Sequence, residues 1–131
     1  MEFSRPNRTY TGPELCLMSA CQVVTLLKAG DISPEELLKD ASRRMDQVEP
    51  QVNATVIRDD ERALMALNKL GDRQGKNGGH RGWLAGLPIG IKDLIAVAGM
   101  RGTAGSPALA HFIAEESDAL IDRLEARGAI F

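Results

Sequence analysis

Residues 87–97 read Leu-Pro-Ile-Gly-Ile-Lys-Asp-Leu-Ile-Ala-Val, a nearly unbroken apolar run with one Lys–Asp pair in its middle. A short apolar run without strict alternation is typical of a strand that is covered on both faces, as in α/β proteins. We therefore expect an α/β fold, in which this strand belongs to a mixed sheet covered by helices. The apolar residues 129–131 indicate the start of a further, parallel strand.

Two helices are predicted before this run, and a tight turn between them suggests a helical hairpin packed on the start of the sheet. The first is expected to begin at Ser19, which has capping-box spacing to a glutamine, and to stop at Gly30. The second begins at Ser33, where a proline follows at the first helical position and a glutamate closes a second capping box. Pro50 is predicted to end it.

The segments that flank the hairpin are predicted from residue type. Residues 52–57 are rich in β-branched side chains and indicate a strand. A third helix is expected from Asp59 or Asp60 through Leu70. The glycine-rich residues 71–82 that follow are predicted to form a loop.

The two ends of the chain give the remaining elements. Residues 1–14 are polar, contain prolines, and are predicted to form an extended arm. Near the other end, Ser117 is expected to cap a last helix that Gly128 ends. Leu120, Ile121 and Leu124 would line the inward face of that helix. The whole of 1–131 is interpreted as part of one domain.

The composition excludes several classes of function. The chain has 131 residues and a net charge of −2, so it lacks the basic surface that nucleic-acid binding requires. No apolar run approaches the roughly 20 residues of a membrane span, and the N-terminus has no secretory pattern. Cys16 and Cys21 match no zinc or redox spacing and are expected to be partly buried thiols. A cytoplasmic location is the resulting expectation.

Lys92 is the candidate functional residue, because lysine is rarely placed in an apolar run without a reason. If the amine is buried, desolvation lowers its pKa, and the neutral form can act as a general base. In an extended segment Asp93 would point to the opposite side, so it is not an automatic ion-pair partner. The alternative is that Lys92 lies at an exposed strand end and is simply solvated. The residues alone leave both interpretations open.

Three motifs carry a resemblance to a known family. Residues 86–93 read Gly-Leu-Pro-Ile-Gly-Ile-Lys-Asp, residues 99–106 read Gly-Met-Arg-Gly-Thr-Ala-Gly-Ser, and residues 118–129 read Asp-Ala-Leu-Ile-Asp-Arg-Leu-Glu-Ala-Arg-Gly-Ala. In this order and spacing they closely resemble the amidase signature family. The predicted hairpin also looks like the family's N-terminal helices, so the resemblance covers most of the chain from about Ser19 to Phe131.

The resemblance implies a catalytic role for Lys92 as the base of a Ser–cis-Ser–Lys triad. In the family this triad hydrolyses a carboxamide through an acyl-serine intermediate, and it needs no cofactor or metal. Both family serines belong to a Gly/Ser-rich stretch that is absent from this sequence. Ser106 is the serine nearest the signature, and we interpret it as a turn residue. The chain is therefore expected to be an incomplete amidase that is inactive alone.

Two alternatives to a broad amidase remain at this stage. The chain could be a truncated, non-catalytic interaction module whose apolar edge associates with a partner or forms a homodimer. It could also belong to the transamidating subunit of a tRNA-dependent amidotransferase, which uses glutamine as its ammonia donor. A small-molecule amide is the expected substrate. His80 and His111 are interpreted as surface residues, because neither has a metal-ligand partner at a suitable spacing.

Overall fold

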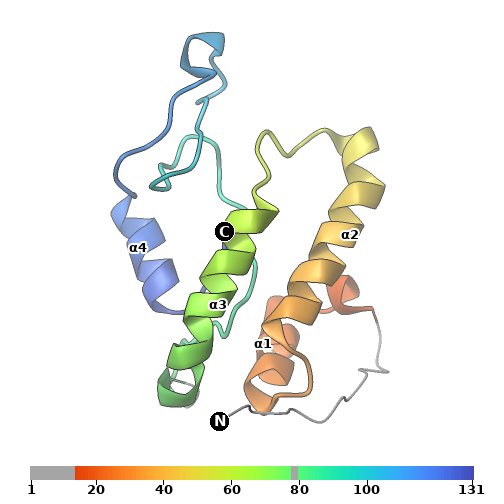
Figure 1. The fold of residues 1–131 in the computed structure, drawn as a ribbon. Helices are drawn as coiled ribbons and strands as arrows, with labels where there is room; N and C mark the ends of the chain where they lie inside the picture. The colour runs from red at the N-terminus through yellow and green to blue at the C-terminus, as the bar shows by residue number, and fades with distance from the viewer. Residues whose placement is uncertain (1–13, 78–79) are drawn as a thin grey trace.

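The computed structural model describes residues 14–77 and 80–131, and helices dominate this part of the chain (Figure 1). The elements, in chain order, are η1 (Leu15–Leu17), α1 (Ala20–Ala29), α2 (Pro34–Val52), α3 (Asp60–Asn77), η2 (Pro107–Leu109) and α4 (Ala119–Ala126). Helices α2 and α3 run side by side, and the segment between α3 and α4 is long and irregular. The arm predicted at residues 1–14 lies almost wholly outside the described residues.

Both predicted capping boxes are confirmed, and they explain where α1 and α2 begin. The Gln22 backbone N–H donates to Ser19 Oγ at 3.4 Å, and the Glu36 N–H donates to Ser33 Oγ at 3.1 Å. Each bond satisfies a backbone donor that has no partner inside its helix. Gly30 ends α1 in the left-handed region with φ +76°, as expected. Helix α2 continues past Pro50 to Val52, so the predicted end was two residues short.

Replacing Ser33 by alanine is expected to cost about 1 kcal/mol of stability, because the Glu36 N–H would lose its acceptor. Glycine at the same position should cost only a few tenths of a kcal/mol. Urea unfolding followed by circular dichroism measures both variants. Equal losses for alanine and glycine would contradict the assignment of Ser33 as the cap.

Helix α3 corrects the expectation of a loop at residues 71–82. Asp59 caps the helix, since its Oδ1 accepts from the Arg62 N–H at 2.9 Å, and α3 then continues through Asn77. A glycine inside a helix costs only about 1 kcal/mol, so the good helix formers around Gly71 and Gly75 can carry the helix onward. Residues 78–79 lie outside the described part of the chain.

The predicted strands are not formed, and no mixed sheet is observed in the part of the chain that the structure describes. Residues 87–97 are irregular, as are residues 53–59, and Val52 belongs to α2. Of the expected parallel pairing only a single bridge is present, between Pro88 and Ile130. It is held by Ile89 N–H to Ile130 C=O at 2.8 Å and Ile130 N–H to Leu87 C=O at 3.0 Å. A strand needs a paired neighbour along its edge, and here the pairing stops after one bridge.

Helix α4 begins one residue later than predicted. Its cap is Asp118, whose Oδ1 accepts from the Leu120 N–H at 2.8 Å. Ser117 instead accepts from the Ala98 N–H at 2.9 Å and ties the helix to the preceding loop. Ile121 is fully buried and Leu124 half-buried, as expected, but Leu120 is 49% exposed and does not face inward.

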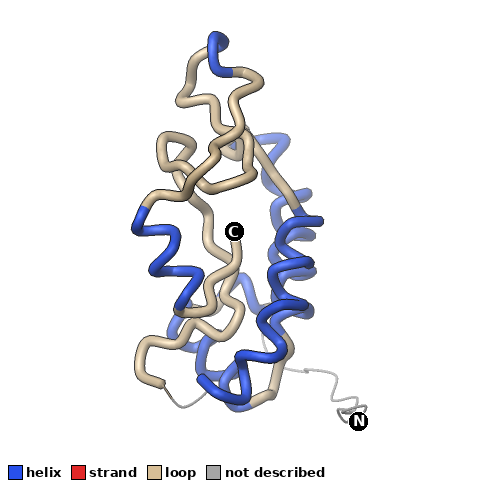
Figure 2. The backbone as a smooth tube through the Cα atoms, turned by 60° about the vertical axis from the view of Figure 1, so that its left-hand side comes forward, coloured by secondary structure: helices blue, strands red, loops and turns tan. Residues whose placement is uncertain are grey.

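The core lies where α1, α2 and α3 meet residues 83–87 and the last residues of the chain. Its buried members are Leu15, Val23, Leu27, Ile32, Leu37, Leu38, Ala63, Leu70, Trp83, Ala85 and Ile130. Figures 1 and 2 both show the C-terminal residue in the middle of the molecule, between α4 and the α2–α3 pair. Among the described helices none is long and apolar enough to cross a membrane.

Two backbone hydrogen bonds fasten residues 84–86 to the end of α4. Leu84 N–H donates to Arg127 C=O and Gly86 N–H to Gly128 C=O, each at 2.7 Å. The Trp83 ring packs directly against Gly128, which has φ +82°. A Cβ at position 128 would stand 2.7 Å from the ring, so only glycine fits this approach.

Candidate active site around Lys92

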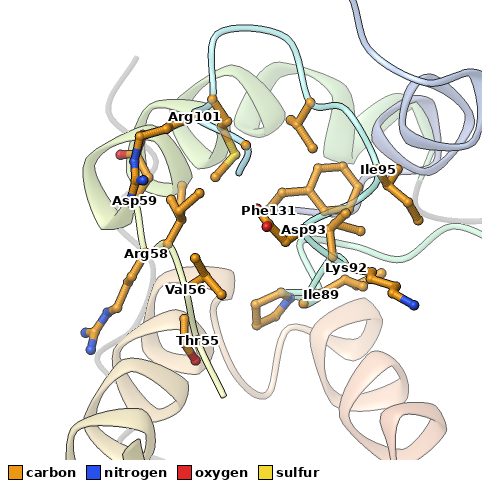
Figure 3. A pocket seen from close by; sticks show the side chains of 18 of the residues that line it. Thr55, Val56, Arg58, Asp59, Ile89, Lys92, Asp93, Ile95, Arg101 and Phe131 are labelled. Atoms are coloured by element: carbon orange, nitrogen blue, oxygen red, sulfur yellow. The ribbon is translucent and has the colours of Figure 1, made fainter. Parts of the chain in front are cut away.

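Lys92 lies in the irregular segment 87–97, where its backbone C=O accepts from the Ile95 N–H at 2.8 Å and closes a turn. Its side chain is exposed and, in the described part of the chain, has no ion-pair or hydrogen-bond partner. Figure 3 shows the ammonium directed away from the side of the pocket formed by Val56. The buried environment expected for this amine is therefore not present in this structure, and the solvated alternative describes it.

Asp93 does not pair with Lys92, as the sequence indicated, and instead holds the neighbouring loop. Its Oδ1 accepts from the Thr103 N–H at 2.9 Å, and its Oδ2 accepts from the Thr103 hydroxyl at 2.6 Å and the Gly105 N–H at 3.1 Å. These bonds, the one from the Thr103 hydroxyl first, hold the pKa of Asp93 below its usual range. Sequence reasoning missed this role, although the Thr-x-Gly spacing of residues 103–105 offers such donors.

The Asp93 contacts predict a pH dependence of the loop. Because the folded-state pKa is lowered, the stabilisation is present above the unfolded value of about 3.9 and is lost as pH falls through the lower folded value. We expect the amide signals of Thr103 and Gly105 to shift together in that acidic range. An NMR titration measures this, and Asp93→Asn should remove the shift. A titration midpoint at or above that of a free aspartate would contradict the assignment.

Residues 99–114 form a loop whose two ends lie close together. Gly99 N–H donates to Ala114 C=O at 2.8 Å and Gly102 N–H to Phe112 C=O at 3.0 Å, around an antiparallel bridge between Arg101 and Ile113. At its tip Ser106 caps η2 by accepting from the Ala108 N–H, in agreement with its predicted role as a turn residue. Asp93, the residue next to Lys92, thus holds this loop in place through Thr103 and Gly105.

A pocket of about 690 Å³ lies beside Lys92. One wall comes from α2 and residues 54–60, and the other from residues 88–97 with Phe131 (Figure 3). Most lining side chains are apolar, among them Met45, Val56 and Phe112. Lys92 is one of the lining residues, but its ammonium points away from the Val56 side of the pocket.

Other reactive side chains lie apart from this pocket. Cys16 and Cys21 are free and exposed, so the expected partial burial of both thiols was wrong. His80 and His111 are exposed, as predicted. Among the described residues no group of His, Cys, Asp or Glu side chains is arranged to hold a metal ion. None of these four side chains lines the pocket beside Lys92.

Comparison with known proteins decides the family. The family model described as Amidase matches residues 36–131, which contain the Lys92–Asp93 pair, the loop it holds and α4. This chain belongs to the amidase family. The A subunit of the glutamyl-tRNA(Gln) amidotransferase of Geobacillus sp. (strain WCH70) is 38% identical to this amidase chain over 106 residues, which are 81% of the chain and 22% of the relative. Acylamidase of Rhodococcus erythropolis is 34% identical over 121 residues, or 92% of the chain and 25% of the relative.

A solved structure has the same fold over the matched region. It is described as "An unexpected vestigial protein complex reveals the evolutionary origins of an s-triazine catabolic enzyme", and its TM-score is 0.75 at 25% identity. The match covers 86% of this amidase chain and 25% of that one. The chain thus spans about a quarter of the length of the relatives it matches.

Proposed function

We propose that this chain supplies Lys92 as the proton-accepting residue of a carboxamide hydrolase. The observation that carries the proposal is the position of Lys92 in the family-matched segment, next to an aspartate that fixes the adjoining loop. Because Asp93 is fully engaged with Thr103 and Gly105, the amine of Lys92 has no competing partner in the described part of the chain. The nucleophile would come from polypeptide that corresponds to the rest of the relatives.

The proposed reaction requires the amine to be neutral. Lys92 is exposed in this chain, and further polypeptide that covered it would take the amine out of water and favour its neutral form. The neutral amine then takes the proton of a serine hydroxyl, directly or through a second serine, while the serine oxygen attacks the amide carbon. The C–N bond breaks as the leaving nitrogen receives that proton. Water next hydrolyses the acyl-serine and releases the carboxylate.

A second candidate within the same chemistry is favoured by the relatives. Several of them are named as the A subunit of glutamyl-tRNA(Gln) amidotransferase, so the ammonia released could serve a transfer reaction and not simple hydrolysis. Both candidates use the same base and the same acyl-serine. They differ in the amide consumed, which would be glutamine in the transfer reaction and a broader range of small carboxamides in the hydrolase.

The test combines this chain with the acylamidase of Rhodococcus erythropolis from which the matched quarter has been removed. We expect no ammonia release from small carboxamides by either polypeptide alone and measurable release by the pair. Faster release from glutamine than from simple acyl amides would favour the transfer reaction. Turnover by this chain alone that Lys92→Ala abolishes would overturn the proposed division of the active site.

A further inference from the structure

The pocket beside Lys92 offers almost no free charge to a ligand. Arg58 is paired with Asp46 at 2.5 Å and with Asp60 at 2.7 Å, and Asp59 accepts from the Arg62 N–H. Arg101 donates to the Ala110 C=O at 3.0 Å, and Asp93 is held by Thr103. Among the lining side chains Lys92 is the remaining charged one, and its ammonium points away from the Val56 side of the pocket. An occupant of this pocket must therefore be largely apolar.

The pocket also exposes backbone groups that an extended polypeptide could use. In the part of the chain that the structure describes, Val56, Ile57 and Ile91 make no backbone hydrogen bond. All three line the pocket. Ile91 lies on the wall that carries the single bridge between Pro88 and Ile130, and Val56 and Ile57 lie on the opposite wall. Free N–H and C=O groups next to a started β-pairing can accept an added strand.

Several large apolar side chains around the pocket are left in water. Val56 is 57% exposed, Leu94 is 63% exposed and Phe112 is 51% exposed. Neighbouring apolar side chains that stay uncovered in this way mark an interaction surface. This chain accounts for only about a quarter of its relatives' length. The partner we consider for this surface is therefore polypeptide that corresponds to the remaining three quarters of those relatives.

We infer that this pocket receives an extended apolar segment of the polypeptide that corresponds to the other three quarters of the relatives. The segment pairs with the free backbone groups of Val56, Ile57 and Ile91 and covers the Val56 and Phe131 side chains. The substrate is excluded from this pocket, because the Lys92 ammonium lies on a different face. The inference rests on family membership and names the partner of the proposed active site.

The test measures binding between this chain and the truncated acylamidase by pull-down and by size-exclusion chromatography with light scattering. The acylamidase's own matched quarter is the positive control and shows that the truncated polypeptide can bind. Val56→Asp should weaken binding at least tenfold, because a desolvated carboxylate would have no partner. Val52→Asp is the matched control, since Val52 is 62% exposed and lies outside the pocket. It should bind as the unmodified chain does.

Four further outcomes distinguish the possible occupants of the pocket. Binding that Lys92→Met leaves intact while activity is lost supports both the docking surface and the proposed function. Binding with Val56→Asp as strong as with Val52→Asp overturns the docking surface, as does no binding when the control quarter binds. This chain could instead form a dimer that Val56→Asp dissociates and Val52→Asp does not. That result would also overturn the inference and would assign the pocket to a second copy of the chain. Circular dichroism confirms that each variant is folded.

Discussion

Lys92→Met is expected to lower carboxamide hydrolysis by the reconstituted amidase about 10²- to 10⁴-fold, the range that a general base contributes. Methionine keeps a flexible stem of similar length and removes only the amine. Lys92→Arg should be as inactive, because a guanidinium keeps its proton at any working pH and cannot accept another. The turnover rate under saturating substrate, measured by ammonia release, gives the comparison.

Two measurements keep this result specific to proton transfer. Lys92 is exposed and unpaired in the described part of the chain, so the variants should unfold at the same urea concentration as the unmodified chain. Lys69→Met is the control for loss of one exposed lysine, and it should retain full activity. An active Lys92→Arg enzyme would show that a fixed positive charge suffices, which would sink the role of Lys92 as the base.

Gly128→Ala is expected to destabilise the chain by about 2–4 kcal/mol through two separate effects. The added Cβ would stand 2.7 Å from Trp83 Cη2 and 2.9 Å from two further ring carbons, and a buried indole has little room to shift. Alanine would also have to adopt φ +82°, which disfavours any residue with a Cβ. The steric and the conformational costs act together at this position.

Gly99→Ala isolates the conformational cost. Gly99 has φ +76°, but an added Cβ there meets nothing within 4 Å, so a loss of about 1–2 kcal/mol is expected. Trp83 is the only tryptophan, and its fluorescence during urea unfolding reports both variants directly. Equal losses for the two alanine variants would mean that the contact between Trp83 and Gly128 contributes nothing to stability.

The features that sequence predicted well are those decided by residues close in the chain. Ser19 and Ser33 cap their helices as expected, because a capping box depends only on a side chain and the backbone three residues away. Residues 87–97 were predicted as a strand from their apolar character, yet strand formation depends on a neighbour elsewhere in the chain. That neighbour amounts to one bridge at Ile130 in this structure.

The candidate site also has features that the sequence predicts and features that it does not. The residues of the Lys–Asp pair could be found from the sequence, and the family match contains them. The solvent exposure of Lys92 could not be found, because it depends on what covers the chain and not on the residues beside it. The hydrogen bond from the Thr103 hydroxyl to Asp93 joins residues ten positions apart in irregular chain, and no periodic sequence pattern predicts such a contact.

The bridge between Pro88 and Ile130 also bears on the order in which the chain folds. Helices α1 and α2 are capped by residues close in the chain and can form within microseconds. The bridge forms only when residues 88 and 130, which are distant in the chain, meet. This step loses loop-closure entropy before the stabilising contacts are made. We therefore expect the helices to acquire protection from hydrogen exchange first and the Ile89 and Ile130 amides last, so that the wall beside Lys92 is the latest and most easily reopened part of the molecule.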